Sequence, residues 1–150
     1  MPGDTIGCVF GIFDLFHIGH LDTLRQAAAQ CDRLIVSVAS DDLVEDICGV
    51  RPFVPLIERV EIVRTVRVVA EVRALSSLDL KAEVHRVGAD VVFVPDDELD
   101  GVQLALLKDH LTPPATWSGS RLTHLISGRR TTSSQLIATL AGSTTRSSVA

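Results

Sequence analysis

The sequence predicts an α/β fold with a doubly wound, mostly parallel five-stranded sheet and helices on both faces. Short apolar runs that suit buried strands alternate along the chain with segments of helical periodicity. Right-handed crossovers join such strands into parallel pairs. With 150 residues and 46% hydrophobic content, the chain is long enough for one hydrophobic core and too short for two domains of ordinary size. We therefore expect a single domain.

Three strands and two helices are expected in the first half of the chain. The run I-G-C-V-F at 6–10 is apolar, and Leu21, Leu24 and Ala27 then recur at helical spacing. Pro55 suits the first turn of a helix, where its missing N–H is not needed. In order, the elements are a strand at 6–10, a helix through 21–28, a strand at 34–39, a helix that begins at 55, and a third strand that 66–72 lead into.

The second half continues this alternation. Gly88 is placed to end a helix, and Pro95 to stop a strand. In order, the elements are a helix at 78–87, a strand at 91–94, a helix at 102–110, a strand at 122–126 and a helix at 133–140. The succession is Rossmann-like. We expect it to form one domain over residues 1–141, followed by a flexible Ser/Thr-rich tail at 142–150.

The charge and composition of the chain argue against some classes of binding partner. The formal net charge is −5 and the pI is about 5.4, which argues against a nucleic-acid surface. The N-terminus lacks the basic start and apolar core of a secretion signal, and no apolar stretch approaches the length of a membrane span. We therefore expect a cytoplasmic protein with no nucleic-acid or membrane partner.

The segment from Gly11 to His20, G-I-F-D-L-F-H-I-G-H, is expected to connect the first strand to the helix that follows it. A helix N-terminus at the carboxyl edge of such a sheet attracts phosphate. As imidazolium ions, His17 and His20 would share one face of the first helical turn and could hold a polyphosphate and stabilise the charge that develops as it breaks. Gly11 and Gly19 would let a ligand approach the backbone. The alternative is that both histidines are ordinary polar residues at a helix start.

This decapeptide resembles the motif of the cytidylyltransferase-like nucleotidyltransferases, which include glycerol-3-phosphate cytidylyltransferase and the nucleotidyltransferase part of the heptose enzymes. The resemblance covers roughly residues 5–140. It implies that a phosphate monoester attacks the α-phosphate of CTP, or less favourably ATP, and releases pyrophosphate. It also implies catalytic roles for His17 and His20. The residues that it implies for nucleotide binding in this motif are Gly11, Phe13, Asp14 and Gly19.

Three aspartates and one arginine also fall where the resembled family keeps functional groups. Asp41 follows the second strand, and Asp96 and Asp97 follow the fourth, so all three are expected at the edge that carries the histidines. They would orient Mg²⁺ or the acceptor, unless they form solvated acidic loops. Arg59 matches an arginine that would bind phosphates, and its alternative is a place on a wet helix face.

The chain departs from the resembled family in the segment 45–50, which we interpret as a loop. Family members carry a lysine in this region, whose ammonium can stabilise the transition state, whereas E-D-I-C-G-V contains none. Arg51 is the nearby cation and is the predicted substitute, although a guanidinium is bulkier than an ammonium.

A hydroxyl-rich segment before the expected last helix resembles the S-T-T or S-T-S segment of the family. Hydroxyls at a helix start can cap the helix and can bind phosphate oxygens. Helix capping alone would need no arginines, so phosphate binding is the preferred interpretation. The residues predicted to bind the nucleotide here are Arg129, Arg130, Thr132 and Ser133.

Together these features predict a nucleotidyltransferase that transfers CMP, or AMP, to a small phosphorylated metabolite, with Mg²⁺ as cofactor and a homodimeric assembly. The main alternative is a catalytically silent nucleotide-binding or interaction protein that lost the loop lysine. A third is a metalloprotein that uses Asp14, His17 and His20, although no fourth ligand is evident. The three cysteines show neither zinc spacing nor a disulfide framework, and no protein-bound metal is predicted.

Overall fold

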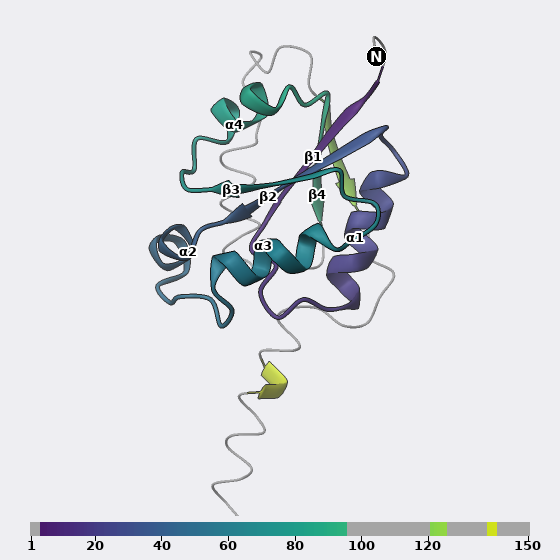
Figure 1. Cartoon of the computed structure of the whole chain (residues 1–150). Coiled ribbons are helices and arrows are strands. Elements are labelled where there is room, and N and C mark those ends of the chain that lie inside the picture. The colour runs from purple at the N-terminus through teal and green to yellow at the C-terminus, as the bar shows by residue number, and fades with distance from the viewer. Residues whose placement is uncertain (1–3, 96–120, 126–137, 141–150) are drawn as a thin grey trace, which may run out of the picture.

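The computed structural model describes residues 4–95, 121–125 and 138–140 (Figure 1). Its strands are β1 (Ile6–Gly11), β2 (Arg33–Ala39), β3 (Glu71–Leu75), β4 (Val91–Pro95) and β5 (Arg121–Leu125). They form one sheet in the order β3-β2-β1-β4-β5, and every neighbouring pair is parallel. The order reverses between β1 and β4, so the carboxyl ends of these two strands form the switch point where such sheets bind ligands.

Within residues 4–95, four helices lie between β1 and β4: α1 (Ile18–Ala28), α2 (Asp41–Cys48), α3 (Leu56–Arg64) and α4 (Leu80–Val87). Asp79 caps α4 by accepting the N–H of Ala82, and Gly88 ends that helix at φ +72°. In the part of the chain that the structure describes, none of the helices has the length and apolar character needed to cross a membrane.

The helices lie on both faces of the sheet, as a doubly wound fold requires. Alternation along β1 sends Cys8 and Phe10 to one face and Val9 to the other. The first face packs against α2 and α4, and the second against α1 and α3. The predicted α/β fold is therefore confirmed.

Helix α2 is a correction, because the sequence interpretation placed a loop at 45–50. Ser40 caps this helix by accepting the N–H of Leu43 at 3.2 Å, and the carboxylates of Asp41 and Asp42 lie in its first turn. Gly49 ends it at φ +79°. These signals are local and could have been recognised. The loop that holds Arg51 therefore begins at Gly49 instead of Glu45 and runs over residues 49–55.

The valine-rich segment 66–72 leads into the third strand, as expected, and β3 begins at Glu71. The N–H of Val66 bonds to Val63 and that of Val69 bonds to Val66, which turns the chain after α3. The valines of this turn pack, partly buried, against the core of the α1 and α3 face. Burial, and not strand pairing, accounts for their apolar character.

Several expectations fall outside the described residues. These are the helix at 102–110, most of the helix at 133–140, the domain boundary at 141 and the tail at 142–150. Residues 138–140 are helical, as predicted.

Candidate active site

The segment Gly11–His20 runs from the last residue of β1, at the switch point, into the first turn of α1. Two residues of this turn, Phe13 and Leu15, have left-handed backbone angles, with φ of 56° and 49°. Such angles are costly for residues with a Cβ and persist only where the surroundings enforce them. The turn is thus held in a defined shape just ahead of the two histidines.

His17 and His20 form a reciprocal capping arrangement at the start of α1. Nδ1 of His17 accepts the N–H of Gly19 at 3.0 Å, and Nδ1 of His20 accepts the N–H of His17 at 3.2 Å. The two rings stack with centroids 3.9 Å apart. Because each Nδ1 is an acceptor, each neutral ring carries its proton on Nε2. The backbone thereby fixes both the orientation and the tautomer of the pair.

The charge state of the pair differs from expectation. Burial lowers the pKa of His20 to about 3, with a smaller effect from His17, and burial also lowers the pKa of His17. Both rings are therefore neutral near pH 7, and the expectation of imidazolium ions is wrong for the ligand-free protein. As neutral groups, each ring can donate a hydrogen bond from Nε2 and not from Nδ1.

Phe13 is part of the scaffold of this site. Its side chain is 5% exposed, and its ring centroid lies 5.4 Å from that of His20. Phe16 lies on the same imidazole at 5.3 Å. A Cβ at Gly11 would come within 2.7 Å of the Phe13 ring, so that ring requires the glycine. The sequence interpretation had assigned the space over Gly11 to a ligand, whereas the structure places Phe13 there.

Asp14 joins this turn to a distant loop. Its carboxylate accepts the N–H of Phe53 at 2.7 Å and the N–H of Val54 at 2.9 Å, and it also accepts the N–H of Leu15. These bonds attach the 49–55 loop to the motif. The predicted contact of Asp14 with the nucleotide stays a prediction.

Arg59 lies on the inner side of α3, and its side chain is fully buried. Its guanidinium donates to the carbonyls of Val54, Ile12 and Ala39, each at 2.7 Å. It also donates to Oδ1 of Asp41 at 2.7 Å. The alternative of a wet helix face is therefore wrong, and the predicted phosphate contact would have to compete with four protein acceptors.

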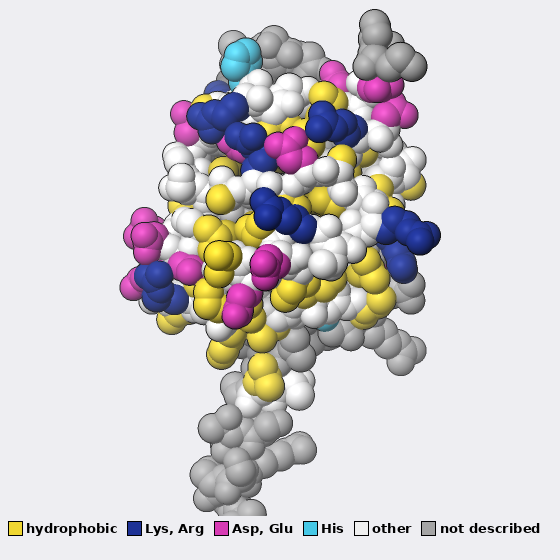
Figure 2. All heavy atoms as spheres, in the orientation of Figure 1, with side chains coloured by type: hydrophobic (Ala, Val, Ile, Leu, Met, Phe, Trp, Pro, Cys, Tyr) yellow, Lys and Arg dark blue, Asp and Glu magenta, His cyan; other side chains and the backbone are white. Residues whose placement is uncertain are grey.

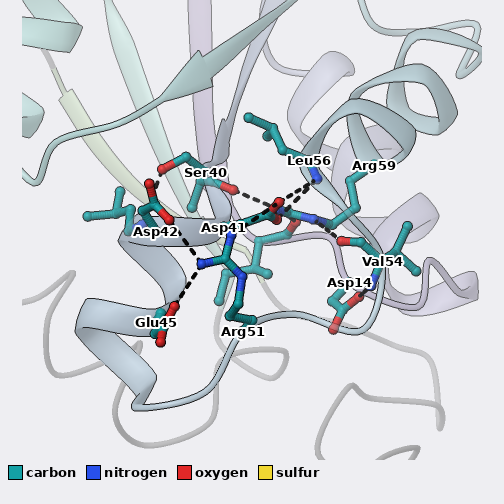
Figure 3. Close-up of polar contacts among 12 residues, drawn as sticks. Asp14, Ser40, Asp41, Asp42, Glu45, Arg51, Val54, Leu56 and Arg59 are labelled. Carbon is teal, nitrogen blue, oxygen red and sulfur yellow. Dashed lines mark hydrogen bonds and ion pairs between the residues drawn. The ribbon is translucent and has the colours of Figure 1, made fainter.

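Asp41 connects the two arginines of this region. Its carboxylate also accepts the N–H of Leu56, and its Oδ2 lies 4.0 Å from Nη2 of Arg51. Burial raises the pKa of Asp41, but the hydrogen bonds from Arg59 and Leu56 and the two positive charges outweigh it and hold the pKa below its usual value. Figure 3 shows this carboxylate between the guanidinium groups of Arg51 and Arg59.

Arg51 is exposed and bound to α2 (Figure 3). Its Nη1 donates to Glu45 at 2.8 Å and to Asp42 at 3.0 Å. The predicted catalytic cation is thus tied to carboxylates in the ligand-free protein. A contact with the α-phosphate requires exchange of these partners, which is inexpensive for exposed ion pairs.

Six predicted residues, four for nucleotide binding and two beside Mg²⁺ or the acceptor, lie outside the described part of the chain. The strands that precede them end side by side, since Pro95 of β4 pairs with Leu125 of β5. Their roles stay predictions. The residues are Asp96, Asp97, Arg129, Arg130, Thr132 and Ser133.

The described residues do not form a metal site. Within 4–95, 121–125 and 138–140, no three His, Cys, Asp or Glu side chains are arranged to hold a metal ion. Both oxygens of Asp14 accept backbone N–H groups, and both imidazole Nδ1 atoms are engaged, which disfavours the metalloprotein alternative. Asp41, predicted beside Mg²⁺ or the acceptor, is engaged with Arg59 and Leu56.

The chain is similar to a known protein family and to several known proteins. Residues 8–113 match the family model described as Cytidylyltransferase-like. The chain is 34% identical over 103 residues to FAD synthase of Thermococcus sibiricus, a match that covers 67% of this chain and 68% of that protein. It is 38% identical over 115 residues to ethanolamine-phosphate cytidylyltransferase of Dictyostelium discoideum, covering 69% of this chain and 31% of the relative.

Two further matches cover more than four fifths of this chain. The bifunctional protein HldE of Hydrogenovibrio crunogenus is 30% identical over 83% of this chain, which is 27% of that protein. A lipopolysaccharide core biosynthesis protein from Thermoplasma volcanium superposes with a TM-score of 0.65 and 21% identity, over 86% of this chain and all of that one. The chain spans less than two thirds of the length of most curated relatives that it matches.

Proposed function

Because the chain belongs to the cytidylyltransferase-like family, we propose that it transfers a nucleotidyl group from a nucleoside triphosphate to a small phosphorylated acceptor and releases pyrophosphate. The motif resemblance favours CTP over ATP as donor. The relatives are named both as FAD synthases and as a cytidylyltransferase, and FAD contains an adenylyl group, so both donors belong in the test.

The observation that carries this proposal is the locked pair of His17 and His20. Both Nδ1 atoms are bound to backbone N–H groups, so the donor atom of each ring is Nε2, at the N-terminus of a helix and beside the switch point of the sheet. Fixed donors need no reorganisation when negative charge grows on a phosphate during transfer. A pair that merely capped α1 would not require two imidazoles in one stack.

The reaction needs little from the protein beyond placement and charge. An acceptor phosphate is already ionised near pH 7, so no general base is required. Its oxygen attacks the α-phosphorus, the new P–O bond forms, and the bond to the oxygen bridging the α- and β-phosphates breaks, so that pyrophosphate leaves with the electron pair. His17 and His20 would donate hydrogen bonds to the phosphate oxygens during this step. We propose Mg²⁺ as cofactor, held mainly by the triphosphate, where it would screen negative charge.

A second candidate is a catalytically silent nucleotide-binding protein. Its support is the 49–55 loop, which contains no lysine and whose arginine is held by Asp42 and Glu45. One experiment distinguishes these two candidate functions. Calorimetry measures binding of CTP and of ATP, and pyrophosphate release is followed with phosphoethanolamine, sugar phosphates, polyol phosphates and flavin mononucleotide as acceptors. We expect release with one donor and one acceptor class; binding of a nucleotide without release in any combination would favour the silent protein.

A further inference from the structure

Arg59 connects four parts of the site. Its acceptors are Ile12 beyond the end of β1, Ala39 at the end of β2, Val54 in the 49–55 loop, and Asp41 at the start of α2. A guanidinium has five N–H donors in one rigid plane, and four of them are used here. A lysine could not bind these acceptors in the same plane.

The 49–55 loop is held from two sides at one point. Asp14 of the motif accepts the N–H groups of Phe53 and Val54, while Arg59 donates to the carbonyl of Val54. Arg51 lies two and three residues before these anchors. The position of the Arg51 backbone relative to the histidine motif therefore depends on Arg59 and Asp14.

We propose that Arg59 is a positioning residue for nucleotidyl transfer, which fixes the 49–55 loop against the histidine motif without contacting the nucleotide. Four of the five donors are bound to protein acceptors and the side chain is fully buried, so a phosphate contact through any of these four donors would require the guanidinium to leave an acceptor. A buried carbonyl or carboxylate without a donor is unfavourable, so such an exchange is opposed. Misplacement of a reacting group by about 1 Å can lower a rate by about 10²-fold. The inference rests on the proposed function.

The test compares Arg59→Lys, which keeps the charge, with Arg64→Lys on the exposed side of the same helix. We expect Arg59→Lys to accelerate amide exchange at Phe53, Val54 and Leu56, to lower kcat about 10- to 100-fold, and to change nucleotide KM and Kd by less than about threefold. Arg64→Lys should change none of these. A nucleotide Kd that rises in step with the loss of kcat would identify Arg59 as a phosphate ligand and overturn the inference.

Activity per folded molecule distinguishes the proposed positioning role of Arg59 from a role in stability alone. If Arg59→Lys lowers the melting temperature but leaves kcat unchanged below it, the inference is wrong. A double-mutant cycle adds a second criterion: because Arg59 acts through the loop, Arg59→Lys should cost little further activity in an Arg51→Ala background, and additive losses would contradict this. Failure of wild type to release pyrophosphate would overturn the proposed function, whereas an active wild type with an equally active Arg59→Lys overturns only the inference about Arg59.

Discussion

His17 and His20 stack with ring centroids 3.9 Å apart, and the backbone N–H of His17 is the donor that orients His20. The same two residues therefore begin α1, fix each other and supply both Nε2–H donors. This relationship joins helix capping to the proposed chemistry, so the first prediction must separate the two.

For His17, the informative change is His17→Asn. Asparagine is a good N-cap, so α1 should keep its start, but the imidazole Nε2–H is lost. We expect transfer to fall at least about 10²-fold with little change in melting temperature. His85→Asn, at an exposed position of α4, is the matched control. Near-normal turnover of His17→Asn would show that His17 is only a cap.

Stability should depend on pH through His20. Its pKa is about 3 in the folded protein against 6.5 in the unfolded chain, so the unfolded state binds more protons between these values. The stabilisation is complete above about pH 6.5 and is lost as the pH falls, by about 2 kcal/mol between pH 7 and pH 5. Urea unfolding at both pH values measures this. His20→Gln should remove most of the dependence and His85→Gln should not; an equal slope in all three proteins would disprove the buried neutral imidazole.

The loop arginine is predicted to replace the missing lysine. Arg51→Ala should lower turnover about 10²-fold and leave thermal stability nearly unchanged, because the ion pairs it loses are exposed. Arg33→Ala, which removes an exposed arginine paired with Glu71, is the control. Steady-state kinetics and thermal melts measure both effects.

A lysine can then be introduced into the same loop. Gly49 is unsuitable because its φ of +79° strains any other residue, whereas Val50 is 67% exposed. Val50→Lys in the Arg51→Ala background should restore part of the turnover. If Arg51→Ala is fully active, the loop supplies no transition-state charge.

We predict a homodimer. Val50 and Phe53 of the 49–55 loop and Ile57 in the first turn of α3 are 67%, 67% and 73% exposed, and Figure 2 shows apolar side chains on this surface of the molecule. An apolar surface of this kind favours association between identical copies. Light scattering should give roughly twice the 16.2 kDa chain mass, and Ile57→Glu should reduce it to that of one chain. A monomer at micromolar concentration in the wild type would refute the prediction.

The sequence predicts those features of the fold and the site that depend on residues close together in the chain. Strand composition, the motif after β1, Pro95 and Gly88 predicted the fold and the place of the histidines. The cap signals of α2 were also local, but the acidic segment lacks a long apolar periodicity and was interpreted as a loop. Spacing could not reveal that Arg59 would bond to Ile12, 47 residues away, because such pairing depends on the tertiary arrangement. The sequence also did not show the Phe13 ring over Gly11, which accompanies the left-handed backbone of Phe13, or the neutral state of His20, which follows from its burial.

The most direct test follows the α-phosphorus of the donor. CTP and ATP, each labelled at the α-phosphate, are incubated with Mg²⁺, the acceptor panel and either wild type or His17→Asn. We expect that wild type moves the label into a phosphatase-resistant product and releases one pyrophosphate per product formed, and that His17→Asn does so at least about 10²-fold more slowly. Label that stays in bound nucleotide, appears as free monophosphate, or moves equally fast with His17→Asn would contradict this expectation.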